Sequence, residues 1–147
     1  MDIPDTFHFT HQRRVEFSDT DLAGIMHFAN YLRYAESAEH ALWRSLGRSV
    51  HSNTEAGQHG WPRLNISCSY FKPARFEQLL SIRLRIEEIR NTTIRYSFFV
   101  FDDSDLELLI ASGEVTIIHV ALESNSGRMQ KAPIPDDLRR LLVELTA

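Results

Sequence analysis

Two aspartates, Asp19 and Asp21, stand in a short polar segment directly before the strongest helical pattern of the chain. The first residues of a helix carry unpaired backbone N–H groups and a partial positive charge, and such donors can hold the oxygen of a polarised carbonyl. A carboxylate beside them can attack the carbonyl carbon or deprotonate a water molecule. Thioester cleavage requires these two parts. A plain turn before a helix, where Asp is also common, is the alternative interpretation.

The helix that follows is predicted for residues 29–46, about 27 Å long at 1.5 Å per residue. Charged residues, among them Glu36 and Glu39, lie mainly between the apolar positions, and Gly47 stands where the residue after a helix end belongs. The apolar positions recur at steps of three and four, which is typical of an amphipathic helix: Tyr31, Tyr34, Ala35, Ala38, Ala41, Leu42 and Leu46.

Other parts of the chain alternate apolar and polar residues with a period of two, which predicts strands. A loop rich in Ser, His, Asn and Gly is predicted for residues 48–60, and a short helix for residues 136–145 after two prolines. Short turns between consecutive strands favour antiparallel pairing, so an α+β fold is expected, with an antiparallel sheet wrapped around the long helix. The predicted strands cover residues 13–17, 64–70, 80–86, 94–100 and 106–120.

The 147 residues are expected to form a single domain, 1–147, with 43% hydrophobic and 24% charged residues. The formal net charge of −4 argues against nucleic acid as the main partner, because phosphate binding favours a basic surface. Cys68 is the only cysteine, so neither an intramolecular disulfide nor a cysteine metal cluster can form. A signal peptide and a membrane span are not expected, which favours a cytoplasmic protein.

The segment around the two aspartates also resembles the signature of the 4-hydroxybenzoyl-CoA thioesterase family. That signature has a hydrophobic strand, an Asp-x-Asp turn, a small residue with Gly and two apolar residues, and an aromatic-rich stretch with Asn-Tyr opening the helix. The corresponding residues here are Val15–Phe17, Asp19–Asp21, Ala23–Met26 and Phe28–Tyr31. Two later segments are similar to the family's strand-connecting turn and C-terminal end, namely Tyr70–Phe76 and Pro133–Pro135.

This resemblance implies a hotdog fold and an acyl-CoA thioesterase that uses no cofactor. It implies that Asp21 is the catalytic carboxylate and that the backbone N–H of Phe28 polarises the thioester carbonyl. Gly24 would allow the turn to pack closely against substrate. The family also forms homodimers, often paired into homotetramers, with the active site at the dimer interface. Residues from a second subunit are then expected in the site, and the candidates are Arg63, Asn65, Thr92 and Thr93.

One departure from the family pattern concerns a histidine. Bacterial members that act on short acyl-CoA usually carry a histidine seven residues after the catalytic aspartate. Here that position is Phe28, and His27 lies one residue earlier. An aromatic residue at this position is closer to the aryl-CoA branch of the family. A direct catalytic role for His27 is therefore one hypothesis, and a side chain that points elsewhere is the other.

Further candidates are charged residues outside the turn. Glu36 lies fifteen residues after Asp21, on the long helix, and is either a second carboxylate near the site or a solvent-facing residue. Lys72, Arg75 and Arg90 lie at strand ends or turns and are candidates for binding the phosphates of CoA, with ordinary surface charge as the alternative.

The remaining patterns favour no other chemistry. His8 and His11 are three residues apart but have no third ligand in view, so a metal site is not expected. Two alternatives to a thioesterase remain open. One is a hydratase or dehydratase of the wider hotdog superfamily, which would usually combine a histidine with a carboxylate. The other is a module that binds acyl-CoA without turning it over.

Overall fold

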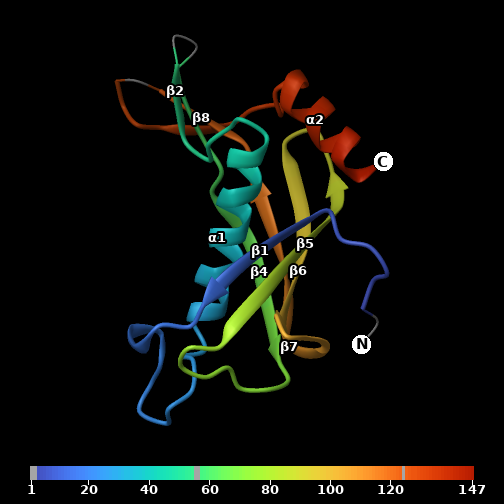
Figure 1. Ribbon diagram of the computed structural model, residues 1–147. Helices are drawn as coiled ribbons and strands as arrows, with labels where there is room; N and C mark the ends of the chain where they lie inside the picture. Colours follow the sequence, from blue (N-terminus) through green and yellow to red (C-terminus); the bar gives the residue numbers. More distant parts are fainter. Residues whose placement is uncertain (1–2, 55–56, 124) are drawn as a thin grey trace.

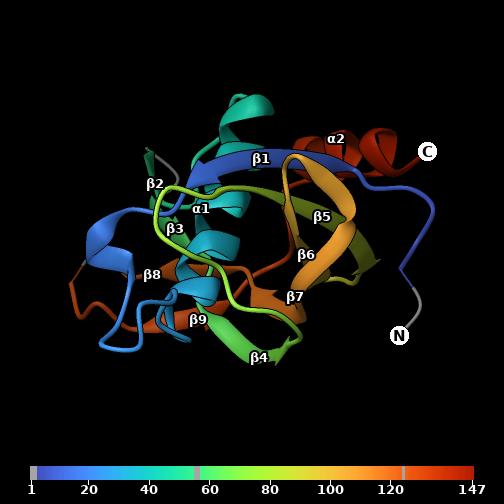
Figure 2. The ribbon, with the colours of Figure 1, turned by 60° about the horizontal axis from the view of Figure 1, so that its bottom comes forward.

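A five-stranded antiparallel sheet curves around one long helix in the computed structural model, which describes residues 3–54, 57–123 and 125–147 (Figures 1 and 2). The helix is α1, Asn30–Ser45, and the strands lie in the order β1-β5-β6-β7-β4. This arrangement is the hotdog fold, so the predicted fold is confirmed. The strands are β1 (Phe9–Arg14), β5 (Leu79–Ile89), β6 (Thr93–Asp102), β7 (Asp105–Ile118) and β4 (Arg63–Tyr70).

Helix α1 forms as its sequence period predicts, one residue shorter at each end than residues 29–46. Tyr34, Ala35 and Ala38 lie on its buried face, each at most 1% exposed. Alanines on this face let the helix approach the sheet closely. The sheet contributes alternate residues of its central strands to the same core, and Leu80, Ile82, Leu84, Phe98 and Val100 are almost fully buried. Burial on this scale is the main stabilisation of the fold.

The first strand differs from its prediction over residues 13–17. Strand β1 begins earlier and ends at Arg14, and Phe17–Asp19 form a single turn of 3-10 helix. The Asp19 carboxylate accepts the backbone N–H of Glu16 at 3.0 Å, while the Asp19 N–H donates to the Glu16 carbonyl at 3.0 Å. These reciprocal bonds form the turn that follows the strand, and the strand ends three residues before its predicted end at residue 17.

The predicted loop at residues 48–60 is also wrong in part, because it contains two strands of a second sheet. That sheet has four strands in the order β2-β3-β8-β9: β2 (Ser52–Thr54), β3 (Gly57–Gly60), β8 (Val120–Leu122) and β9 (Met129–Lys131). The predicted long strand at residues 106–120 is accordingly divided between β7 and β8. These strands are only three or four residues long, and β3 pairs with β8 far along the chain, so local apolar alternation does not indicate them.

The C-terminal helix α2, Asp136–Thr146, agrees with the predicted helix at residues 136–145. It buries Leu138 and Leu142 at the end of the sheet where β5 and β6 meet (Figure 1). Within the described residues, neither helix is long and apolar enough to cross a membrane.

Candidate active site

The two aspartates of the Asp-x-Asp turn occupy different environments. Asp19 is 8% exposed, and its carboxylate accepts a hydrogen bond of 2.6 Å from the hydroxyl of Tyr34 as well as the Glu16 N–H. Asp21 is exposed, and one of its oxygens accepts the N–H of Ala23 at 2.8 Å. No described residue bonds to the other oxygen of Asp21. Asp19 therefore holds the turn together, whereas Asp21 keeps an oxygen free for chemistry.

The turn that carries Asp21 is closed by backbone hydrogen bonds. The Asp21 N–H donates to the Ile25 carbonyl at 2.9 Å, and the Gly24 N–H donates to the Asp21 carbonyl at 3.0 Å. Gly24 has φ +78°, a left-handed conformation that glycine adopts without a steric penalty. The Met26 N–H then donates to the Ala74 carbonyl at 2.8 Å, which fixes the turn to the segment before β5. Asp21 therefore lies on a loop whose backbone is fixed by these hydrogen bonds.

The segment directly before α1 contains a backbone N–H group beside this loop, that of Phe28. The His27 N–H donates to the Asp19 carbonyl at 2.8 Å, and the Ala29 N–H donates to Nδ1 of His27 at 3.1 Å. Phe28 lies between His27 and Ala29 in the chain, and no described residue accepts a hydrogen bond from its N–H. The Phe28 carbonyl, in contrast, accepts the Tyr70 hydroxyl at 3.0 Å. The backbone at Phe28 is held in place from its carbonyl side while its N–H stays available to a ligand.

Asp21 and Phe28 line the same cavity, of about 500 Å³. Its other walls are mostly apolar or aromatic, and Lys72 is its one basic residue: Ile25, Met26, Tyr31, Tyr70, Phe71, Lys72 and Pro73. A second cavity of about 270 Å³ is also lined by Asp21, together with His27, Asn30 and Arg33. The carboxylate therefore borders both an apolar and a polar space.

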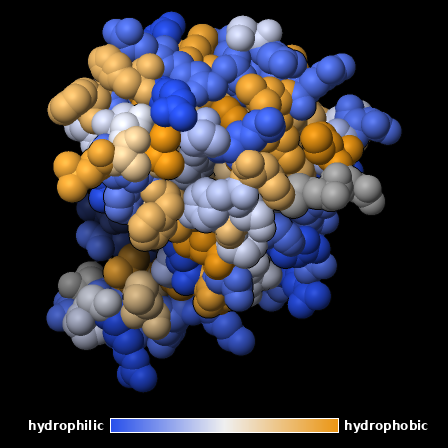
Figure 3. All heavy atoms as spheres, turned by 90° about the horizontal axis from the view of Figure 1, so that it is seen from below, coloured by the Kyte–Doolittle hydropathy of each residue, from blue (hydrophilic) through white to orange (hydrophobic). Residues whose placement is uncertain are grey.

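Several aromatic side chains that line the larger cavity are exposed. Phe28 is 66% exposed, Tyr70 47% and Phe71 46%. Figure 3 views this end of the molecule from below and shows hydrophobic residues gathered there among hydrophilic ones. An exposed apolar surface of this kind usually marks a binding site.

Two tyrosines of the larger cavity contact each other, and neither was predicted as a site residue. The rings of Tyr31 and Tyr70 meet edge to face at 5.2 Å. Burial, together with neighbouring Cys68, raises the pKa of Tyr70 to about 12, so its hydroxyl stays protonated and can donate to Phe28. Burial also raises the pKa of the Cys68 thiol, which disfavours a thiolate nucleophile. Two sequence signals had included Tyr70: the alternating pattern of residues 64–70 and the Tyr70–Phe76 segment that resembles the family's strand-connecting turn.

The structure brings together only some of the predicted basic residues. Lys72 lines the cavity of Asp21, and Arg75 lies next to it, since its backbone pairs with Ile25. Arg90 lies beyond the other end of β5, where its side chain pairs with Glu88 and its carbonyl accepts a hydrogen bond from Arg139 of α2. Within one chain, Arg90 is therefore remote from Asp21.

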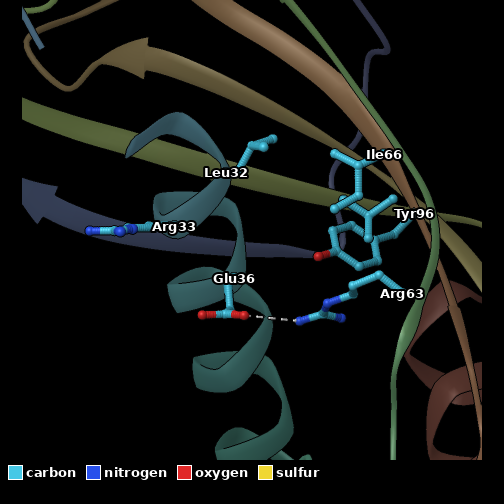
Figure 4. Close-up of a pocket in the computed structure, with 7 residues that line it drawn as sticks. Leu32, Arg33, Glu36, Arg63, Ile66 and Tyr96 are labelled. Carbon is cyan, nitrogen blue, oxygen red and sulfur yellow. Dashed lines mark hydrogen bonds and ion pairs between the residues drawn. The ribbon is translucent and has the colours of Figure 1, made fainter. Parts of the chain in front are cut away.

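The remaining candidates are divided between two places. His27 lines the smaller cavity beside Asp21, but its Nδ1 is used by the Ala29 N–H. Glu36 lies further along α1 and faces Arg63 of β4 across a separate cavity (Figure 4). Glu39, predicted on the charged side of the helix, is instead 1% exposed and bonded to the same arginine. Among the described residues, no group of three or more His, Cys, Asp or Glu side chains could hold a metal ion.

Comparison with known proteins supplies independent evidence. The profile of the thioesterase-like superfamily matches residues 15–142. A 1,4-dihydroxy-2-naphthoyl-CoA hydrolase of Prochlorococcus marinus is 32% identical over 136 residues, covering 88% of this chain and 85% of that protein. A 4-hydroxybenzoyl-CoA thioesterase of Pseudomonas is 27% identical over 133 residues, covering 87% of this chain and 92% of that protein.

A solved structure agrees with the fold. The crystal structure of a 1,4-dihydroxy-2-naphthoyl-CoA thioesterase from Synechocystis superposes with a TM-score of 0.82 and 23% identity, covering 95% of this chain and 98% of that one. At this identity the structural similarity shows the fold alone. The profile match and the Prochlorococcus relative show the family. The chain therefore belongs to the thioesterase-like superfamily and is an enzyme of the thioester hydrolase class.

Proposed function

We propose that this enzyme hydrolyses acyl- or aryl-CoA thioesters and that Asp21 supplies the anionic oxygen for the reaction. One observation carries the proposal: Asp21, which keeps one carboxylate oxygen free, and Phe28, whose N–H is accepted by no described residue, line the same cavity just before α1. The N–H holds the carbonyl oxygen as negative charge develops on it, and the positive end of the helix adds to this stabilisation. The relatives named above act on aryl-CoA, which supports a CoA thioester as substrate.

Two routes lead from this geometry to free acid and CoA. In the first, Asp21 attacks the carbonyl carbon, the C–S bond breaks, the thiolate takes up a proton, and water hydrolyses the resulting mixed anhydride. In the second, Asp21 takes a proton from water, and the hydroxide adds to the carbonyl before the thiolate leaves. A single turnover quenched rapidly and analysed by mass spectrometry separates them, because only the first route leaves the acyl group on the peptide that contains Asp21.

The CoA portion meets basic side chains near the mouth of the cavity. Lys72 lines the cavity and Arg75 adjoins it, so these two are suited to the phosphates of CoA. Arg90 reaches a CoA phosphate only if another subunit brings it there, since it lies at the far end of β5 in its own chain.

We further propose that two copies pair through β4 into a homodimer, with the active site at their interface. Two such dimers then form a homotetramer. Strand β4 is the last strand of the large sheet, and edge strands invite pairing with another copy. Two of its apolar side chains, Leu64 and Ile66, are 58% and 42% exposed in the single chain. A partner subunit would cover them.

Light scattering on a size-exclusion column tests this assembly. Leu64→Lys is expected to yield a monomer with much reduced hydrolysis, because the charge lies in the interface. Leu106→Lys is the matched control, since Leu106 is 48% exposed but sits by the turn between β6 and β7. An unchanged oligomer with Leu64→Lys would exclude pairing through β4.

The central experiment follows release of free thiol from a panel of short, long and aromatic acyl-CoA thioesters and one acyl-carrier-protein thioester. Asp21→Asn is expected to lower turnover by about 100-fold or more, as for loss of a catalytic base, with an unchanged melting temperature. Asp105→Asn is the control, because Asp105 accepts the N–H of Glu107 at 3.0 Å in the same kind of turn, away from the cavity. Near-full turnover by Asp21→Asn would overturn the assignment.

The same assay separates the two alternative functions. A hydratase or dehydratase would change the acyl group without releasing thiol. A binding module would retain acyl-CoA with no turnover at any chain length. Both readings lose support if thiol release depends on Asp21.

A further inference from the structure

The solvent side of α1 carries arginines that are not paired within the chain. Arg33, His40 and Arg44 follow one another at steps of seven and four, so they lie on one face of the helix. Arg33 and Arg44 are exposed, and no described residue forms an ion pair or a hydrogen bond with either guanidinium. Glu36, the exposed carboxylate of the same helix, pairs instead with Arg63, and Figure 4 shows Arg33 pointing away from that pair.

Strand β1, the edge strand of the large sheet, lies beside α1 and continues this surface (Figure 1). The Arg13 guanidinium lies over the ring of Tyr34, 4.1 Å from its centroid, and forms no ion pair with a described residue. His11 Nε2 lies 3.4 Å from Oγ of Ser37 on α1. These basic residues of the two elements, together called the basic stripe, are His11, Arg13, Arg33, His40 and Arg44.

The positive charges of the basic stripe act on one another. Burial lowers the pKa of His11, and the charges of Arg44 and Arg13 lower it further. Glu16 brings one negative charge near Tyr34, at the Arg13 end of the stripe. Like charges that lie close together repel one another, which costs stability in the free chain. An anionic partner would remove that cost.

The basic stripe begins beside the proposed reacting groups and extends away from them. Arg33 lines the cavity of about 270 Å³ that Asp21 and Asn30 also line. Arg44 lies fourteen positions after Asn30, about 21 Å further along the helix axis. An ion pair with a phosphate forms only within about 4 Å, so one nucleotide does not engage the whole stripe. A compact domain of about 100 residues has a radius of gyration of about 13 Å and covers this span.

The charge of the whole chain narrows the choice of partner further. The formal net charge is −4, so an acidic protein is repelled by most of the surface and directed to the basic stripe. Arginine suits such an interface, because its planar guanidinium binds a carboxylate through two parallel hydrogen bonds.

We propose that the basic stripe is the docking surface for an acyl carrier protein, an acidic protein that bears its acyl group as a thioester on a phosphopantetheine arm. The carrier presents carboxylates to the arginines while its thioester reaches Asp21. Water and the thioester then give the free acid and the thiol of the carrier. Complementary charges of this kind contribute to association rate and partner choice more than to affinity. The inference rests on the proposed thioesterase function and adds a second form of substrate to acyl-CoA.

The experiment compares kcat/KM for one acyl group presented on CoA and on an acyl carrier protein, each followed by release of free thiol. Arg44→Glu is expected to lower kcat/KM for the carrier thioester by about fivefold or more, because a repulsion replaces an exposed attraction. The CoA thioester should change less than about twofold, because charges more than about 10 Å apart are screened at 0.1 M salt. Arg83→Glu is the matched control and should leave both values unchanged, since Arg83 lies on the opposite face of the sheet from α1, between the core residues Ile82 and Leu84.

A charge swap separates docking from loss of folding. Carrier proteins whose surface glutamates are replaced one at a time by lysine are tested with the Arg44→Glu enzyme. At least one should recover part of the lost kcat/KM, which a misfolded enzyme would not do. Recovery with none of them would overturn the docking surface.

Three further outcomes would overturn the carrier proposal and leave the thioesterase function standing. One is turnover of acyl-CoA but not of the carrier thioester by the wild-type enzyme. Another is an equal fall for both substrates in Arg44→Glu, which would place the phosphates of CoA on the stripe. The third is a smaller oligomer of Arg44→Glu on a size-exclusion column, which would show that a second copy covers the stripe. Thiol release from neither substrate class would overturn both proposals.

Discussion

The hydroxyl of Tyr34 and the carboxylate of Asp19 lie 2.6 Å apart in the core, although fifteen residues separate them in the chain. This bond fixes the beginning of the Asp-x-Asp turn to the second turn of α1. Asp21 follows two residues later and faces outward from the same turn. Asp19 therefore anchors the loop to α1, and Asp21 projects from the loop toward solvent.

Replacing Tyr34 with Phe tests the anchoring role of this bond. A hydrogen bond to a charged group contributes about 1.5–3 kcal/mol, so the free energy of unfolding should fall by about that amount. Turnover should fall far less than in Asp21→Asn, because the reacting oxygen is untouched. Urea titration followed by circular dichroism measures the free energy of unfolding, and release of free thiol measures turnover. An unfolding free energy equal to that of the wild type would show that Asp19 does not depend on Tyr34.

Tyr70→Phe removes the hydrogen bond of 3.0 Å to the Phe28 carbonyl but keeps the ring packed on Tyr31. The net value of such a bond is about 0.5–1.5 kcal/mol, which corresponds to a fall in kcat of roughly 2- to 13-fold. Steady-state kinetics measures it. Tyr31→Phe is the control, since the Tyr31 hydroxyl accepts the Ala74 N–H at 3.3 Å and does not bond to the helix start. A larger loss of kcat in the control than in Tyr70→Phe would contradict the positioning of Phe28 by Tyr70.

Gly113→Ala is expected to destabilise the sheet where β4 and β7 lie side by side. A Cβ atom at Gly113 would come within 1.9 Å of the Ser67 carbonyl oxygen and 2.7 Å of the Phe98 ring, so backbone has to move. Overpacking usually costs about 1–3 kcal/mol, and a clash with backbone belongs at the upper end or beyond. Gly60→Ala is the matched control, because open space surrounds that position. Similar melting temperatures for the two variants would argue against the close approach.

The stability of the enzyme should decrease as the pH falls below 6.5. Burial lowers the pKa of His119 below its usual value of 6.5, and burial lowers the pKa values of His8 and His11 in the same direction. Between the folded pKa and 6.5 the unfolded chain binds protons that the folded chain does not, so unfolding is favoured there. The stabilisation is complete above pH 6.5 and is lost as the pH falls toward and through the folded pKa.

Unfolding free energies at pH 7.5 and 5.5 measure this effect. His119→Phe should show a smaller difference between the two pH values than the wild type, even if it is less stable at both. His51→Asn is the control because His51 is exposed. If the difference is the same in His119→Phe as in the wild type, His119 does not contribute to it.

Much of the scaffold follows from the sequence alone. The period of 3.6 over residues 30–45 and the period of 2 in β5 and β6 arise from neighbours within a few residues, and all three elements form where predicted. The polar turn before the helix, with Gly24 in its left-handed conformation, is equally local. These patterns place two carboxylates at a helix start without reference to the rest of the chain.

Tertiary structure decides what each of those groups can do. Asp19 is buried because Tyr34 reaches it, and Glu39 is buried because Arg63 and Tyr96, 24 and 57 residues further along the chain, reach that carboxylate. Arg90 is separated from Asp21 because β5 runs the length of the sheet between them. A periodic pattern records which side of an element faces the core, but pairing between charges depends on which distant strand lies opposite, and only the folded chain determines that.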